Sequence, residues 1–210
     1  MRRKNQLKVI VFGATGKTGQ HVCRLALDRG HEVTAFTRSA GRLSLSETRL
    51  MVAQGDVMDS DSVAAAIAGH DAAIVALGSN GLRDKTTLTV GTGAIIESME
   101  RHNVGRLIVL SAAGVRSSWN QISLTARLAF RTFLRNIYAD HEAQEAKVAG
   151  CSLDWTIVRA AILKDNPGSG HYQASNTGKV TQISREDLAD FLVKQVEDDT
   201  YRKQAVSVTW

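Results

Sequence analysis

The chain has 210 residues, 43% of them apolar and 22% charged, which suits one compact domain over residues 1–210 with a substantial core. Its formal charge of +5 is spread along the sequence, so we expect an anionic cofactor and substrate and no nucleic-acid partner. The two cysteines, Cys23 and Cys151, form no CxxC or Cys/His cluster, which argues against a disulfide framework and a zinc site.

The chain begins with a basic segment, Met1 to Lys4, followed by the apolar run LKVIVFGATG. That run is far too short to cross a membrane, and no small-residue cleavage site follows it. We therefore expect a cytoplasmic protein without a membrane partner.

The first predicted strand, Lys8 to Gly13, and the first predicted helix, Thr18 to Gly30, are joined by a glycine-rich loop. The Lys17-Thr18 pair in this loop raises the possibility of an ATP-binding P-loop, which needs four residues between its first Gly and the Gly-Lys-Ser/Thr. Here only two residues separate successive glycines, so the ATP interpretation fails on spacing.

The spacing Gly13-x-x-Gly16-x-x-Gly19 instead fits a dinucleotide loop. Gly13 permits a tight turn, Gly16 lets the backbone approach a pyrophosphate, and Gly19 lets helix and strand pack closely. The helix N-terminus then supplies amide donors. Glycines that serve only the turn are the alternative.

The second predicted strand, Glu32 to Arg38, bears on the choice of cofactor. An acidic residue at its end would bind a ribose 2′-hydroxyl and favour NAD. The sequence has Arg38 there and Arg42 four residues on, with no acid beside them. Because guanidinium groups bind phosphate through charge-assisted hydrogen bonds, we expect NADP(H); two solvated loop arginines are the alternative.

The third and fourth predicted strands, Arg49 to Asp56 and Asp71 to Gly78, end near the same ligand. Asp56 can accept from an adenine amino group, Val57 can pack on the ring, and Gly78 allows a ribose to approach. Each could also be an ordinary turn residue.

The remaining elements continue the alternation of strands and helices. Gly30, Gly69 and Gly150 should end helices in the left-handed conformation, and Ser184 should cap the last helix. The pattern predicts a three-layer α/β/α Rossmann-type fold with a mostly parallel sheet and a small C-terminal substrate lobe, in which 163–182 is an irregular substrate-side segment. The other expected helices are Ser60 to Gly69 (capped by Asp59 or Asp61), Thr87 to Asn103, Leu124 to Gly150 and Arg185 to Asp198, and the other strands are Arg106 to Ala112, Asp154 to Ala160 and Ala205 to Trp210.

The motifs FGATGKTG, TRSAGR, QGDV, VALG and LDWTIVRAAIL make the chain resemble the atypical short-chain dehydrogenase/reductases with an NmrA-like NAD(P)-binding domain. Within them it is most similar to the biliverdin-IXβ reductase/flavin reductase group. The resemblance implies hydride transfer from NADPH to a flavin, a linear tetrapyrrole or a quinone-like acceptor. The cofactor residues that it implies are Gly13, Thr15, Gly16, Lys17, Thr18, Gly19, Arg38, Arg42, Asp56, Val57, Leu77 and Gly78.

The sequence departs from that family at the catalytic positions. The Tyr-x-x-x-Lys pair is missing, because Tyr138 is followed by Glu142, and we interpret Tyr138 as a helix residue. Ser111 lies one place before the family's strand-end serine and could still bond nicotinamide or substrate as the catalytic candidate. Of two histidines in tetrapyrrole-reducing relatives, His141 fits one position, although a solvated side chain is its commoner role, and Ile162 replaces the other.

These observations favour an NADPH-dependent reductase of a planar, electron-poor acceptor, since such a reaction needs no strong acid–base pair. A non-catalytic NADP(H)-binding redox sensor is the alternative. A sugar-nucleotide epimerase ranks last, because the chain lacks both Tyr-x-x-x-Lys and a larger C-terminal domain. A monomer and a homodimer both remain open.

Overall fold

The protein is built on one eight-stranded sheet with the order β3-β2-β1-β4-β5-β6-β10-β8. The computed structural model describes residues 6–45, 47–160 and 162–210, so the basic segment Met1 to Lys4 lies outside it. Neighbouring strands are parallel except β8, which runs antiparallel to β10. The strands are β1 (Lys8–Phe12), β2 (Glu32–Thr37), β3 (Leu50–Gln54), β4 (Ala72–Val75), β5 (Arg106–Ala112), β6 (Asp154–Ala160), β8 (Gln173–Ser175) and β10 (Gln204–Thr209).

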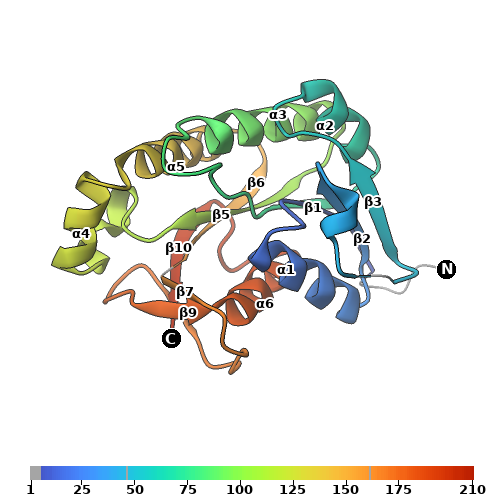
Figure 1. Ribbon diagram of the computed structural model, residues 1–210. Coiled ribbons are helices and arrows are strands. Elements are labelled where there is room, and N and C mark those ends of the chain that lie inside the picture. The colour runs from blue at the N-terminus through green and yellow to red at the C-terminus, as the bar shows by residue number, and fades with distance from the viewer. Residues whose placement is uncertain (1–5, 46, 161) are drawn as a thin grey trace.

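Helices cover both faces of this sheet (Figure 1), which confirms the predicted three-layer arrangement. One face carries α1 (Lys17–Asp28) and α6 (Arg185–Lys194). The other carries α2 (Ser60–Ile67), α3 (Thr87–Arg101) and α5 (Arg135–Ala149). No helix of the described residues is long and apolar enough to cross a membrane.

Two apolar cores lie between the sheet and its helical layers. Val9, Val11 and Ile74 face one core, whereas Ile10 and Val75 face the other, because successive side chains of a strand point to opposite faces. Both cores consist mainly of Ala, Val, Leu and Ile, as the low aromatic content predicts. Strands buried on both faces therefore explain the continuous apolar runs in the sequence.

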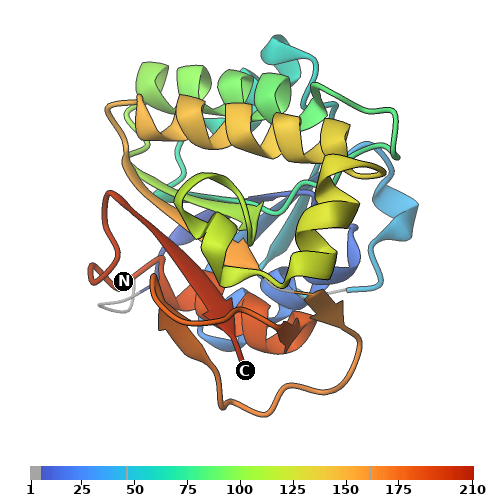
Figure 2. The same cartoon turned by 90° about the vertical axis from the view of Figure 1, so that its left-hand side faces the viewer.

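The helix expected over Leu124 to Gly150 is two helices, α4 (Leu124–Arg131) and α5. The chain leaves the helical conformation at Thr132 (φ −108°, ψ −85°), where the hydroxyl donates to the carbonyls of Leu128 and Ala129. This side-chain hydroxyl competes with the continuing backbone ladder. As Figure 2 shows, α4 and α5 run in clearly different directions.

One expected helix end needs correction. Gly150 ends α5 with φ −87°, whereas Gly30 and Gly69 have the expected positive φ of 95° and 79°. The backbone N–H of Gly150 bonds to Ala146 O in a regular helical turn, so no left-handed residue is needed there. Asp59 caps α2 and Ser184 caps α6, as predicted.

The segment 163–182 is more ordered than an irregular lobe. Its middle forms β8, with Ser175 opposite Ser207 of β10, so it closes one edge of the main sheet. Its ends reach the strands β7 (Ile162–Lys164) and β9 (Gln182–Ser184), which pair in parallel as a second, small sheet. Each of these short strands thereby has a partner strand, which the turn residues of the sequence did not reveal.

Candidate cofactor and substrate sites

The glycine loop forms a tight turn between β1 and α1. Gly13 has φ +81°, and a Cβ on it would lie 2.4 Å from Ala76 O. A Cβ on Gly19 would lie 2.1 Å from Gly13 O, so only glycine lets the helix approach this closely. These contacts fit the turn and packing roles predicted for the two residues.

The N-terminus of α1 is open toward this loop. Gly16 is the N-cap, no side chain caps the helix, and the first turn has no acidic residue. Helix N-terminal amides in this state are donors for an anion. Lys17 pairs with Asp165, with 2.9 Å between Nζ and Oδ2, and Thr18 is buried, so contact of either side chain with a cofactor stays a prediction.

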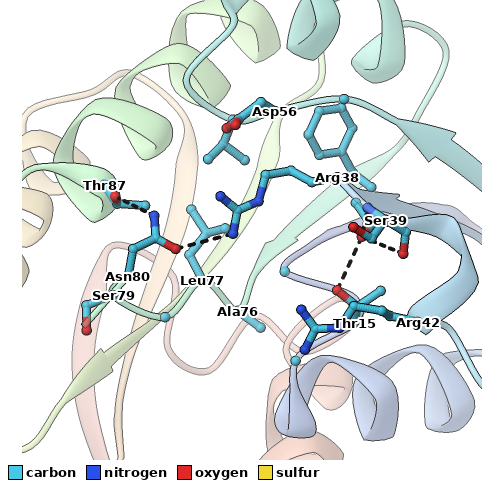
Figure 3. Close-up of a pocket in the computed structure, with 17 residues that line it drawn as sticks. Thr15, Arg38, Ser39, Arg42, Asp56, Ala76, Leu77, Ser79, Asn80 and Thr87 are labelled. Carbon is cyan, nitrogen blue, oxygen red and sulfur yellow. Dashed lines mark hydrogen bonds between the residues drawn. The ribbon is translucent and has the colours of Figure 1, made fainter. Parts of the chain in front are cut away.

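A cavity of about 410 Å³ lies beyond the carboxyl ends of β1 to β4 (Figure 3). The predicted cofactor residues that line it are Gly13, Thr15, Gly16, Arg38, Arg42, Asp56, Val57, Leu77 and Gly78. Parallel strands bring these distant residues to one edge of the sheet. Lys17, Thr18 and Gly19 lie in α1 behind the loop and do not line the cavity.

The two arginines of the cavity project into it from the loop after β2. Figure 3 shows the Arg38 guanidinium extending across the cavity toward Asn80, with Nη2 donating to Oδ1 over 3.2 Å. Arg42 lies beside Thr15 in the same view. No carboxylate of the described residues pairs with either arginine, so both remain available to an anion. Sequence reasoning missed Asn80, because it lies in a loop with no recognisable motif.

A second cavity, of about 1270 Å³, adjoins the carboxyl ends of β5 and β6. Its walls come from the 3₁₀-helix η2 (Arg116–Gln121), α4, the first turns of α5 and residues 179–182. The lining is mainly apolar and includes Ala112, Ala113, Ile122, Phe130, Ile162 and Val180. Such a cavity suits a flat apolar ligand.

Two titratable side chains of this second cavity are held in neutral forms. Tyr138 donates to Ala113 O and stacks on Phe130 at 3.8 Å between ring centroids, and burial raises the tyrosine pKa far above its usual range. Burial also lowers the pKa of the partly buried His141, whose Nδ1 lies 3.3 Å from Gln144 Oε1. Neither is therefore an ionised acid–base group near neutral pH.

Ser111 lies behind the strand ends rather than in either cavity. It is 2% exposed and donates to Glu145 Oε1 over 2.8 Å. Glu145 in turn forms a buried ion pair with Arg159, at 2.7 Å between Oε2 and Nη2. Contact of the Ser111 hydroxyl with nicotinamide or substrate stays a prediction.

A family model described as NAD(P)H-binding matches residues 13–199. A curated Bacillus subtilis relative, named an uncharacterized sugar epimerase, YhfK, is 28% identical, with 97% of this chain and 94% of the relative aligned. Among solved structures, ChuY of Escherichia coli O157:H7, titled an anaerobilin reductase, aligns with a TM-score of 0.81 at 24% identity over 96% of both chains. A Veillonella parvula short-chain dehydrogenase/reductase in complex with NADP aligns at 0.79 and 17% identity, over 97% of this chain and 94% of the other. At these identities the two structures show the shared fold.

Proposed function

The chain belongs to the NAD(P)H-binding family, and from this we propose that it is an NADPH-dependent reductase of a planar, electron-poor acceptor such as a flavin, a quinone or a linear tetrapyrrole. The observation that carries the proposal is the large apolar cavity at the ends of β5 and β6. It opens at the same edge of the parallel sheet as the cofactor cavity, so an acceptor and a dinucleotide can meet there.

The first cavity fits a dinucleotide. The turn at Gly13, the close approach at Gly19 and the uncapped start of α1 leave backbone amides for a pyrophosphate. We assign the 2′-phosphate to Arg38 and Arg42, which makes NADP(H) the preferred cofactor. We assign contacts with the adenine to Asp56 and Val57, and contacts with the ribose to Leu77 and Gly78. When bound, NADPH supplies a hydride to the acceptor.

The residues of the second cavity orient the acceptor. Alanine at positions 112, 113 and 160 leaves room for a flat ring against the ends of β5 and β6. Tyr138 is bonded to Ala113 O and keeps its proton, so it does not act as a general acid. We assign the final proton to solvent, which suffices for a planar conjugated acceptor. Ser111 reaches the reaction only if its bond to Glu145 is exchanged.

The named relatives support different readings of the chemistry. ChuY is titled a reductase of anaerobilin, which agrees with the proposed acceptor class, and the NADP complex of the Veillonella parvula protein agrees with the proposed cofactor. The name of YhfK points to sugar epimerisation instead. Because Glu142 stands where the Tyr-x-x-x-Lys lysine would be, a non-catalytic NADP(H) sensor is the second candidate function.

Turnover with defined acceptors tests the proposal. NADPH absorbance is followed after addition of FMN, a naphthoquinone or biliverdin, and at least one should oxidise NADPH well above the rate in buffer. Ala112→Phe should fill the second cavity and remove this turnover while NADPH still binds. Leu128→Phe, on the exposed side of α4, serves as the matched control. Tight NADPH binding without turnover of any acceptor would favour the sensor.

A further inference from the structure

Gln121 lines the second cavity, and its side chain carries an unpartnered amide donor. Its side chain is only 6% exposed, and its Oε1 accepts from Ser207 Oγ over 2.7 Å. The main chain is fixed as well, because Gln121 O accepts from Val180 N over 2.9 Å. Its Nε2 is buried and has no hydrogen-bond partner among the described residues. A rigid, buried donor of this kind is costly unless a water or a ligand accepts from it.

Arg127 of α4 adds a second unpartnered donor to the same cavity. Its Nε is buried without a hydrogen-bond partner in the described part of the chain. Its guanidinium lies 5.9 Å from the centroid of the Trp119 ring, a cation–π contact that leaves the in-plane N–H groups for an acceptor. The positive charge is also uncompensated, because no described carboxylate forms an ion pair with it.

The charge around the cavity has one sign. Lys179 and Arg185 line it together with Arg127, and no Asp or Glu side chain is among the described lining residues. Arg185 forms an ion pair with Asp165. Among the described lining residues, Arg127 and Lys179 are therefore the cations of the cavity without an ion-pair partner. A low-dielectric wall with uncompensated positive charge attracts an anionic group.

We propose that Gln121 and Arg127 recognise an anionic oxygen group, a carboxylate or a phosphate, on the planar acceptor. This deepens the proposed function and rests on it: the substrate class narrows to acidic derivatives of apolar ring systems. The apolar wall binds the ring system, Gln121 Nε2 donates one hydrogen bond to the anionic oxygen, and the Arg127 guanidinium supplies a charge-assisted one.

Matched acceptor pairs test this inference. FMN and riboflavin differ by a phosphate, and biliverdin and its dimethyl ester differ by carboxylate charge. We measure kcat/KM for NADPH oxidation and, separately, acceptor affinity for the NADP⁺-loaded protein by titration calorimetry. The wild type should favour the anionic member of at least one pair by roughly tenfold or more, and the pair that shows this identifies phosphate or carboxylate as the group.

Four variants locate the discrimination. Gln121→Leu and Arg127→Met should reduce the anionic preference about tenfold, mainly through KM, whereas Arg127→Lys should keep part of it because the charge remains. Gln121→Glu should reverse the preference by repulsion. Gln173→Leu, an exposed glutamine on β8, is the matched control and should leave the preference unchanged. Thermal unfolding by circular dichroism checks that each variant is folded.

The two readouts separate this inference from the proposed function. Discrimination in binding without turnover would refute the reductase but uphold the anion site. A kcat/KM ratio near one between the anionic and the neutral acceptor would overturn the anion site and leave the reductase standing. Equal losses of kcat/KM for both members of a pair in Gln121→Leu would have the same meaning. Neither binding nor turnover of any of the four acceptors would overturn the anion site, and absence of turnover with the naphthoquinone as well would overturn the reductase.

Discussion

At the scale of single residues, the proposed preference for NADP(H) rests on Arg38 and Arg42. They are exposed side chains that cross or flank the first cavity, and the Arg38 guanidinium donates to the neutral amide of Asn80. The surroundings of both guanidinium groups therefore leave their charge available to a phosphate. Neutral partners of this kind are readily exchanged for a charged one, because charge-assisted hydrogen bonds are about twice as strong as neutral ones.

Replacement of Arg38 by Ala should weaken NADPH binding roughly ten- to a hundredfold and NADH binding less than about threefold, because only NADPH has the 2′-phosphate. Calorimetric titration of both cofactors measures this. Arg101→Ala, at the exposed end of α3, should alter neither affinity. Equal losses for NADPH and NADH in Arg38→Ala would contradict the assigned role.

At the scale of secondary structure, α5 fixes the start of α3. The carboxylate of Asp140 accepts from the backbone N–H groups of Leu88 and Thr89 at 2.9 and 3.0 Å. It also accepts from the Thr89 hydroxyl over 2.6 Å. A buried acid from another helix thus adds to the local acceptor Asp84, which binds the N–H of Thr87 over 3.2 Å, and its negative charge is favoured at the positive end of the α3 dipole. The contact joins one wall of the cofactor cavity to the helix that borders the second cavity.

Asp140→Ala should lower the free energy of unfolding by about 3 kcal/mol, because it leaves buried amide donors without an acceptor. Urea unfolding followed by circular dichroism gives this value. The matched control is Asp59→Ala, which removes the exposed cap of α2 and should cost only about 1 kcal/mol. A loss at Asp140 no larger than that at Asp59 would show that the cross-helix cap adds nothing.

At the scale of the whole molecule, burial sets the response to acid. The pKa values of His31, His70 and His141 are lowered, in each case chiefly by burial. For His31 the nearby Glu197 opposes the shift, whereas Arg29 and Arg49 add to it. His31 is 0% exposed, and its Nε2 has no hydrogen-bond partner among the described residues. Folding therefore favours the neutral imidazoles.

Stability should fall as the pH drops below about 6.5, because the unfolded chain then binds protons that the folded protein does not. Urea unfolding midpoints at pH 7.5 and 5.5 measure the effect. Carboxylates contribute little to this difference, because they titrate at lower pH. His31→Gln should show a smaller difference between the two midpoints than the wild type. The exposed His171 offers the control, since His171→Gln should keep the full difference. Identical differences in the two variants would rule out His31 as a contributor.

Local sequence signals were sufficient for most of the fold. Strand-length apolar runs with intervening helical patterns predict the strands β1 to β6 and the three layers, because a strand buried on both faces has apolar residues in succession. The glycine spacing likewise predicts the turn at Gly13 and the close packing at Gly19. The break at Thr132 was not predictable, because the helical pattern of the sequence continues through the residue at which the backbone leaves the helical conformation.

By itself the sequence determined the fold class, the family and the glycine turn, since these depend on residue type and spacing along the chain. Only the tertiary structure decided which polar groups face a cavity and which are already satisfied. The Ser111 hydroxyl donates to Glu145 and the Tyr138 hydroxyl donates to a backbone carbonyl. Gln121, by contrast, keeps a side-chain donor without a partner among the described residues. Hydrogen-bond partners tens of residues apart are fixed by packing, and no local pattern encodes which donor is left over.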